Sequence, residues 1–270
     1  MESLGTHVRR VAIIGHGLIG RSIALALERL DDAPHVISLD RGDDLRHSAG
    51  AELIVLAAPI PENVRILGSL APHVPGDALI TDTGSTKRTT VAAAETLPSR
   101  LRFIGGHPIA GAATGGAAAA TADLFDGHPW ILTPPTAARA EDVAALTALI
   151  QSLGAVPAVM DAEEHDRILA YVSHLPQLAV SALMRVVGQA VGGDGLRVAG
   201  GGLRGSSRLA ASPAPLWRDI VESNADHVDA ALDELIAALR QLRTERDVAL
   251  PRIFAEAARW KRALDAGERS

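Results

Sequence analysis

The sequence predicts an α/β fold, in which a Rossmann-type doubly wound sheet is followed by an all-helical dimerisation domain. Three observations lead to this prediction. A short apolar run breaks into glycines spaced G-x-G-x-x-G, further apolar runs alternate with helical patterns up to residue 159, and long helical segments fill the rest of the 270 residues. We therefore expect a dinucleotide-binding domain over residues 1–161 and a helical substrate and dimerisation domain over residues 162–270.

The first apolar run ends in three glycines, each of which suits a dinucleotide. Gly15 lets the strand turn sharply, Gly17 leaves room for a pyrophosphate, and Gly20 lets the next helix lie close to the sheet. The first amides of that helix, those of Leu18 and Ile19, are expected to face the phosphates. Because glycines also occur in ordinary turns, the motif needs its context.

That context is a second strand, residues 35–39, which ends in Asp40 about twenty residues beyond the last glycine. A carboxylate there binds the ribose hydroxyls and repels a 2′-phosphate, so NAD is favoured over NADP. The neighbouring Arg41 has the opposite effect, which leaves NADP open. The alternative is that Asp40 only begins a polar turn over residues 40–44.

The remaining strands and helices alternate along the chain. The strand candidates are residues 53–57, 78–81, 102–104, 130–133 and 155–159, and the helical patterns cover residues 63–70, 86–96 and 140–153. This alternation predicts a parallel sheet. Pro59, which follows the third strand and precedes the first of these helices, is expected beside the cofactor. The alanine-rich tract 115–122 is either a short helix or a mobile loop.

No strand is expected beyond Asp161, where helical segments are separated by a glycine-rich loop over residues 192–205. One helix carries apolar residues three or four apart, which are Val228, Leu232, Leu235, Ile236, Leu239 and Leu242. Such a stripe must pack against a partner. Pairing of two helical halves in a homodimer is expected, and packing against the chain's own residues is the alternative.

The composition excludes several classes of protein. A net charge of −6 gives no reason to expect nucleic acid or an anionic membrane as a partner. The absence of cysteine excludes disulfides and thiolate metal sites, and no metal is expected. Residues 1–10 are polar, without the apolar segment of a signal sequence, so we expect a cytoplasmic protein.

Two polar clusters, residues 82–87 and 105–111, follow predicted strands. Ligands of open α/β sheets bind beyond the carboxyl ends of strands, so both clusters are placed where a substrate meets the nicotinamide. His107 lies between glycines and a proline, in a defined loop that suits a proton acceptor. The alternative is structural, with His107 bonded to its own loop and Ser85 capping a helix that begins near Thr86.

Further motifs occur in order along nearly the whole chain. They are D-x-G-S-x-K at 82–87, GHPIAG at 106–111, FDG at 125–127, WILTP at 130–134, HD at 165–166, SHLP at 173–176, SRLA at 207–210 and WRDI at 217–220. Together with the glycine motif they resemble the prephenate and arogenate dehydrogenases of tyrosine biosynthesis. As a set the motifs are specific, although each alone is not.

The resemblance implies an NAD-dependent oxidative decarboxylation of a cyclohexadienyl substrate. Hydride leaves the ring carbon that bears the hydroxyl group, and loss of carbon dioxide makes the ring aromatic. By this resemblance His107 accepts the hydroxyl proton and Ser85 hydrogen-bonds the same region. A neutral imidazole lowers the barrier because alkoxide character develops as the hydride departs.

The resemblance also implies a pocket with Arg208 on a substrate carboxylate and with His174 and Trp217 nearby, since a guanidinium binds carboxylates in a bidentate manner. The alternatives are a surface salt bridge for Arg208 and a buried, carbonyl-bonded histidine for His174. His165 and Asp166 are expected to form a solvated helix start without a catalytic role.

The chain departs from the family pattern at two places. Many members carry a carboxylate within the segment that is here 111–114, and a second histidine where this chain has Gln177. Loss of an acid argues against the ammonium group of arogenate and for prephenate. Gln177 can still donate a hydrogen bond to the substrate. A 4-amino analogue of prephenate remains open, and no regulatory domain is expected after Ser270, so inhibition by tyrosine would act at the active site.

A prephenate dehydrogenase is therefore the expected function. Two other classes stay open: a hydroxyacid dehydrogenase or imine reductase, which share a glycine motif and a helical dimer domain, and an NAD-binding protein without catalysis.

Overall fold

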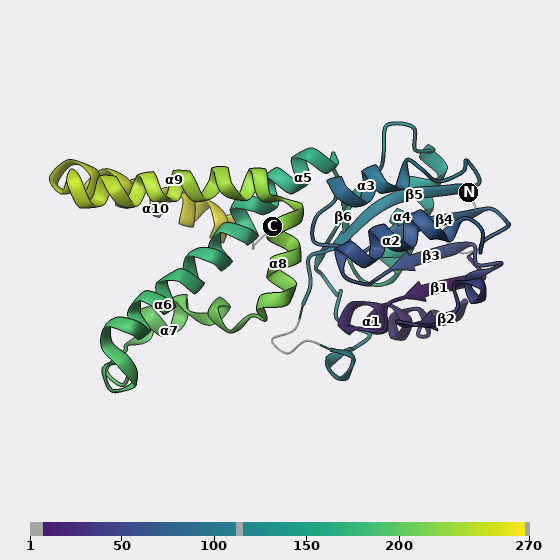
Figure 1. The fold of residues 1–270 in the computed structure, drawn as a ribbon, viewed down its shortest axis with the longest axis horizontal. Coiled ribbons are helices and arrows are strands. Elements are labelled where there is room, and N and C mark those ends of the chain that lie inside the picture. Colours follow the sequence, from purple (N-terminus) through teal and green to yellow (C-terminus); the bar gives the residue numbers. More distant parts are fainter. Residues whose placement is uncertain (1–7, 112–115, 268–270) are drawn as a thin grey trace. The chain divides into compact units, whose positions relative to one another are not determined.

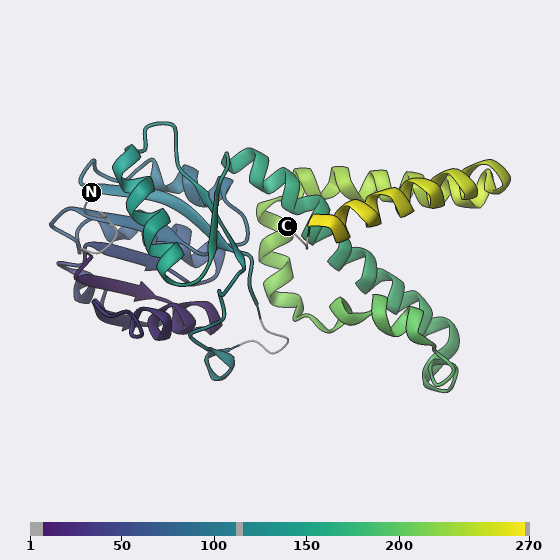
Figure 2. The same ribbon diagram turned by 180° about the vertical axis from the view of Figure 1, so that it is seen from behind.

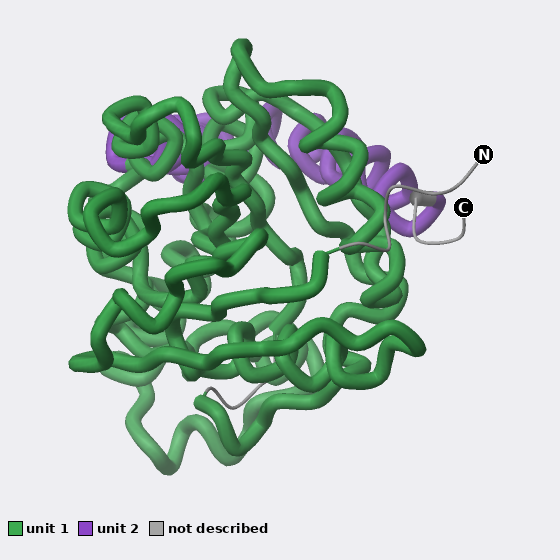
Figure 3. Tube along the Cα trace, turned by 90° about the vertical axis from the view of Figure 1, so that its right-hand side faces the viewer, with its two compact units in different colours: residues 1–224 green, residues 225–270 purple. Residues whose placement is uncertain are grey.

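The computed structural model describes residues 8–111 and 116–267 and divides into two compact units, residues 1–224 and 225–270. Figure 3 distinguishes the two units by colour. The first unit contains all of the strands found in the described residues. The second unit consists of two helices.

A seven-stranded sheet forms the centre of the first unit (Figure 1). Its strands are β1 (Arg10–Ile14), β2 (His35–Leu39), β3 (Leu53–Leu56), β4 (Ala78–Asp82), β5 (Leu101–Pro108), β6 (Pro129–Thr133) and β7 (Val156–Val159). They are arranged in the order β2-β1-β3-β4-β5-β6-β7. The chain adds β2 on one side of β1 and then returns to add β3 on the other side. This reversal in the order of the strands is the arrangement of a doubly wound fold.

The sheet is not wholly parallel, which corrects the prediction from the alternating pattern. Strands β1 to β5 are parallel, but β6 runs antiparallel to β5, and β7 is parallel to β6. A parallel connection needs a crossover, which is usually a helix. Between β5 and β6 the described residues contain only the short 3-10 helix η3 (Ala117–Ala119), and the chain turns back with Ile109 N donating to Pro129 O at 2.8 Å.

Helices cover both faces of the sheet. On one face, α1 (Leu18–Leu27) and α4 (Ala140–Ser152) pack against alternate residues of the strands, as Figure 2 shows for α4. On the other face, α2 (Ile60–Leu70) and α3 (Arg88–Ala94) pack against the intervening residues. Both cores are built mainly from aliphatic side chains, and together they confirm the predicted Rossmann-type fold.

Helices from α5 to α8 belong to the same unit as the sheet. They are α5 (Ala162–Leu169), the π-helix η4 (Ala170–His174), α6 (Leu175–Leu196), α7 (Gly201–Ser206), the 3-10 helix η5 (Arg208–Ala211) and α8 (Ala214–Ser223). The domain boundary expected at residue 161 falls within this unit and stays a prediction.

The glycine-rich segment 192–205 is mostly helical, which corrects the predicted loop. Helix α6 continues to Leu196 across a kink at Gly192, and α7 begins at Gly201. Gly192 has φ +62°, a conformation that glycine adopts readily, whereas the other glycines of the segment do not have positive φ.

The second unit consists of α9 (Ala225–Thr244) and α10 (Arg246–Gly267), which pack along each other. The predicted apolar stripe lies on α9, where Val228 is buried while Ile236 and Leu239 are exposed. Among the described residues, no helix has the length and the apolar character needed to cross a membrane.

Candidate active site

The glycine motif forms a tight turn between β1 and α1. A Cβ added to Gly15, which has φ +116°, would lie 2.5 Å from the backbone of Ala57, and one added to Gly20 would lie 2.0 Å from the carbonyl oxygen of Gly15. A Cβ on Gly17 would meet nothing within 4 Å. The protein's own packing therefore requires glycine at two of the positions, while the third leaves the backbone open to a ligand.

The amides next to this turn are also suitably placed. Helix α1 begins at Leu18, followed by Ile19, and no side chain caps it. The first N–H groups of an α-helix have no partner within the helix, so they are available to an anion.

The other residues expected at the cofactor follow β2 and β3, at the same edge of the sheet. Asp40 directly follows β2, and its carboxylate accepts a hydrogen bond from the backbone of Arg41 at 2.8 Å. Both side chains are exposed. Asp43 N also donates to Asp40 O at 3.1 Å, so the polar turn exists as well. Pro59 lies between β3 and α2, and its place beside the cofactor stays a prediction.

His107 lies near the end of β5 and is hydrogen-bonded to a second histidine. Its Nδ1 lies 2.9 Å from Nε2 of His165, and Nδ1 of His165 lies 2.8 Å from Oδ1 of Asp166. All three side chains are buried, and those of His165 and Asp166 are fully so. We call these residues the His107–His165–Asp166 chain.

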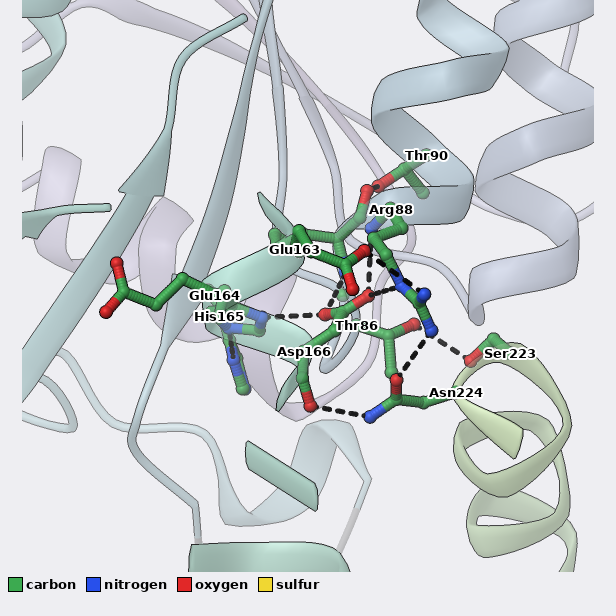
Figure 4. Close-up of polar contacts among 12 residues, drawn as sticks. Thr86, Arg88, Thr90, Glu163, Glu164, His165, Asp166, Ser223 and Asn224 are labelled. Atoms are coloured by element: carbon green, nitrogen blue, oxygen red, sulfur yellow. Dashed lines mark hydrogen bonds and ion pairs between the residues drawn. The ribbon is translucent and has the colours of Figure 1, made fainter. Parts of the chain in front are cut away.

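The carboxylate of Asp166 also holds the start of α3 (Figure 4). Its two oxygens accept hydrogen bonds from the backbone N–H groups of Lys87 at 2.7 Å and Arg88 at 3.0 Å. Burial works to raise the pKa of Asp166, but the hydrogen bonds from His165 and from these amides outweigh it, and the pKa lies below its ordinary value. Asp166 is therefore an ionised, acceptor-only group.

These contacts correct the expectation that His165 and Asp166 form a solvated helix start, because both side chains are fully buried. The helix start is solvated at Asp161, which accepts a hydrogen bond from Glu163 N at 2.8 Å. His165 lies one turn further and is buried together with Leu169, four residues on. That i, i+4 spacing was a signal in the sequence that one face of the helix is buried.

The surroundings keep His107 neutral. Burial lowers its pKa well below the ordinary value of 6.5, and repulsion from the protonated form of His165, from Lys87 and from the protonated form of His174 acts in the same direction. An imidazole that stays unprotonated at neutral pH can accept a proton from a substrate.

A buried ion pair supports the strand just before His107. Lys87 Nζ donates to Asp82 Oδ2 at 2.5 Å and to the carbonyl oxygen of Gly106 at 2.7 Å, while Gly106 N donates to Asp82 Oδ1 at 3.0 Å. Both charged side chains are fully buried. Sequence reasoning assigned no role to Asp82 and Lys87, although the D-x-G-S-x-K motif contains both.

Ser85 follows β4 and is half-buried. It does not cap α3, which begins at Arg88 and is capped by Asp166. The structural alternative for Ser85 therefore fails, and its hydroxyl group has no hydrogen bond to any of the residues that the structure describes.

His174 and Trp217 lie together. Their rings are 6.1 Å apart at 78°, an edge-to-face arrangement. His174 ends the π-helix, a form of helix often found at functional sites. Burial lowers its pKa to about 4. His174 is buried, as the structural alternative expected, but its Nδ1 lies 3.3 Å from the side-chain nitrogen of Asn224 and not beside a carbonyl group.

Gln177 lies one turn beyond His174 and is buried. Its Nε2 donates to Leu209 O at 2.8 Å and to Ser181 Oγ at 3.2 Å, and its Oε1 accepts from Ser212 Oγ at 3.1 Å. These bonds use both amide hydrogens. Gln177 thus fastens the segment that carries Arg208 to α6.

The side chain of Arg208 is exposed and makes no hydrogen bond or ion pair with the described residues. Within residues 8–111 and 116–267, no group of histidine, aspartate and glutamate side chains is arranged to hold a metal ion.

Two family models match the chain. The model for the nucleotide-binding domain of prephenate dehydrogenase matches residues 15–159, and the model for the dimerization domain of the same enzyme matches residues 161–248. The chain belongs to the prephenate dehydrogenase family. The two matches to this family meet near residue 160 and include every residue of the site described above.

Relatives of the prephenate dehydrogenase family agree with this assignment. A prephenate dehydrogenase of Bacillus subtilis is 33% identical over 256 residues, which cover 87% of this chain and 69% of the relative. A cyclohexadienyl dehydrogenase of Zymomonas mobilis is 32% identical over 264 residues, covering 88% of this chain and 89% of the relative. The crystal structure of Synechocystis arogenate dehydrogenase covers 94% of this chain and 99% of its own, with 28% identity and a TM-score of 0.79.

Proposed function

We propose that the protein is an NAD-dependent prephenate dehydrogenase, which converts prephenate to 4-hydroxyphenylpyruvate in tyrosine biosynthesis. Membership of the family and the names of its relatives support the reaction class. The observation that carries the mechanism is the His107–His165–Asp166 chain, because it equips one ring nitrogen of His107 to act as a base.

The residues at the glycine motif fit NAD. The open side of Gly17 and the uncapped N-terminus of α1 suit the pyrophosphate, and the exposed carboxylate of Asp40 suits the ribose hydroxyls. When bound, the nicotinamide supplies the acceptor for the hydride that leaves the substrate.

Hydrogen bonding decides which nitrogen of His107 is the base. The carboxylate of Asp166 accepts only, so Nδ1 of His165 carries a proton, and in the neutral ring Nε2 of His165 is an acceptor. Nδ1 of His107 therefore donates to it, which leaves Nε2 of His107 without a proton. This Nε2 is the atom that takes the hydroxyl proton of the substrate.

The same chain accommodates the proton once it has arrived. A positive charge on His107 is disfavoured by burial and by Lys87. When Nε2 of His107 gains a proton, its Nδ1 proton passes to Nε2 of His165, and the positive charge then lies beside the ionised Asp166. His107 remains neutral overall, and the alkoxide character of the substrate can develop.

The substrate carboxylate is assigned to Arg208, whose guanidinium has no ion pair within the described residues to break before binding. Gln177 acts indirectly, because its amide is already used to hold the segment 208–212. Ser85, His174 and Trp217 complete the pocket in this proposal. The match to a dimerization domain supports a homodimer through the helical part.

Prephenate is favoured over arogenate because the segment 111–114 contains no carboxylate to pair with an ammonium group. Residues 112–114 of that segment lie outside the described residues, so this step rests on the sequence alone.

The test is a comparison of turnover. Purified protein is given prephenate, arogenate or the 4-amino analogue with NAD or NADP, and the absorbance of the reduced cofactor is followed. We expect turnover of prephenate with NAD. Turnover of another substrate without prephenate would overturn the substrate, and cofactor binding without any turnover would favour a non-catalytic protein.

A further inference from the structure

The side chain of Asn224, at the end of α8, joins three groups around the site. Its Oδ1 accepts a hydrogen bond from Arg88 Nη2 at 3.0 Å, and its Nδ2 donates to the backbone carbonyl of Asp166 at 2.8 Å. The same Nδ2 lies 3.3 Å from Nδ1 of His174. Figure 4 shows Asn224 between Arg88 and Asp166. Asn224 is fully buried.

The partners determine which way this amide points. A guanidinium group has only donors, so the atom that faces Arg88 must be the oxygen. A backbone carbonyl has only lone pairs, so the atom that faces Asp166 O must be the nitrogen. The orientation of the Asn224 side chain is thus fixed by two groups that cannot exchange roles.

The orientation of the amide decides the protonation of His174. The second hydrogen on Asn224 Nδ2 faces Nδ1 of His174, which must therefore be the acceptor. The ring proton of neutral His174 then lies on Nε2. Because burial lowers the pKa of His174 to about 4, the ring is neutral at physiological pH.

The Nε2 atom of His174 is free to act on a ligand. Among the described residues, the fully buried side-chain polar atoms without a partner are Thr81 Oγ1, Trp130 Nε1 and Thr133 Oγ1. Nε2 of His174 and Nε2 of His107 also have no hydrogen-bond partner in the described part of the chain, but neither belongs to this fully buried group. Both atoms are therefore accessible to solvent or to a ligand.

The two histidines consequently have opposite roles. The side chain of Asp166, acting through His165, leaves Nε2 of His107 without a proton. The backbone carbonyl of Asp166 orients Asn224, and Asn224 in turn leaves the ring proton of His174 on Nε2. We infer that Asn224 is a positioning residue that holds His174 as a hydrogen-bond donor to a carboxylate or keto oxygen of the substrate. This inference rests on the proposed function for the identity of the substrate, but the protonation state of His174 does not depend on it.

The first experiment is nitrogen-15 NMR of the histidine rings in the unmodified protein, with His174 assigned from the spectrum of His174→Gln. We expect an unprotonated Nδ1 and a protonated Nε2. A protonated Nδ1 on His174 would overturn the inference, whatever the protein's substrate. This measurement needs neither activity nor a variant of Asn224.

The second experiment uses Asn224→Leu, which keeps the branched shape but removes the donor to His174 and the acceptor from Arg88. We expect the Nδ1 resonance of His174 to move toward the protonated value and KM for prephenate to rise about ten-fold, with kcat changed less and NADH affinity unchanged. When His174 is already replaced by glutamine, Asn224→Leu should not raise KM further. The glutamine amide donates a hydrogen bond without needing Asn224 to set its protonation state.

Ser223→Ala is the matched control. It removes the hydrogen bond between the Ser223 and Thr86 hydroxyl groups, one residue away, without touching His174. We expect its His174 spectrum and KM to equal those of the unmodified protein. An equal rise in KM for Ser223→Ala and Asn224→Leu, with an unchanged His174 spectrum in both, would show that Asn224 has only a structural role.

Discussion

Nδ1 of His107 lies 2.9 Å from Nε2 of His165, although 58 residues separate them in the sequence. The first residue belongs to the sheet and the second to the first helix after it. The protonation state of His107 therefore depends on a helix that follows the match to the nucleotide-binding domain.

Replacing His107 with asparagine should lower kcat by about two to four orders of magnitude, because no group remains to accept the hydroxyl proton. NADH fluorescence should show an unchanged cofactor affinity. Unchanged turnover would remove His107 from the mechanism.

Replacing Asp166 with asparagine should lower both activity and stability. The amide removes the negative charge that stabilises protonated His165, and it replaces with a donor one of the two oxygens that accept from the first amides of α3. We therefore expect kcat to fall about 100-fold or more and unfolding to become easier by about 1–2 kcal/mol. The control is Asp161→Ala, which removes the cap of α5 at a similar cost in stability. If both variants lose the same activity, Asp166 acts only through stability.

The stability of the protein should depend on the neutral state of His174. Its pKa is about 4 in the folded chain against an ordinary value of 6.5, so the unfolded chain binds more protons between these values. The free energy of unfolding should therefore decrease as the pH falls from 6.5 toward 4. Denaturation of His174→Gln over the same range should show a smaller decrease, and an equal slope would contradict the assignment.

Replacing Arg208 with alanine should mainly raise KM for prephenate, because the guanidinium is proposed to bind the substrate in the ground state and the transition state alike. Arg204→Ala is the control, since this exposed arginine lies four residues earlier and donates to Ala199 O at 3.2 Å. A change in kcat alone for Arg208→Ala would count against the binding role.

Most of the fold could be predicted from the sequence because local patterns encode it. The glycine spacing and the alternation of apolar runs identified all seven strands, apart from a residue or more at some strand ends and the last four residues of β5. Strand direction is not local. The reversal of β6 accompanies the absence of a crossover helix from the described residues between β5 and β6, which a composition rich in alanine did not reveal.

The candidate site was predicted in part for the same reason. Ser85 and the first glycines of the motif follow strands, where position alone indicates a ligand site, whereas His107 lies in the last part of β5 and not in the expected loop. The role of Asp166 depends on partners 78 and 79 residues away, the amides of Arg88 and Lys87, and no spacing along the chain reports such contacts. The full engagement of Gln177 was hidden in the same way, because its partners at 209 and 212 lie on another segment.

The antiparallel pairing of β5 with β6 determines where the sequence can change without disturbing the sheet. Ile109 N donates to Pro129 O, so the segment between these residues leaves and rejoins the sheet at the same ends of β5 and β6, shortly after His107. Within that segment Ala122 and Phe125 are buried in the core of the sheet, whereas changes at its exposed positions need not alter strand alignment. In the proposed function, selectivity among related substrates can therefore change at these positions while the His107–His165–Asp166 chain is kept.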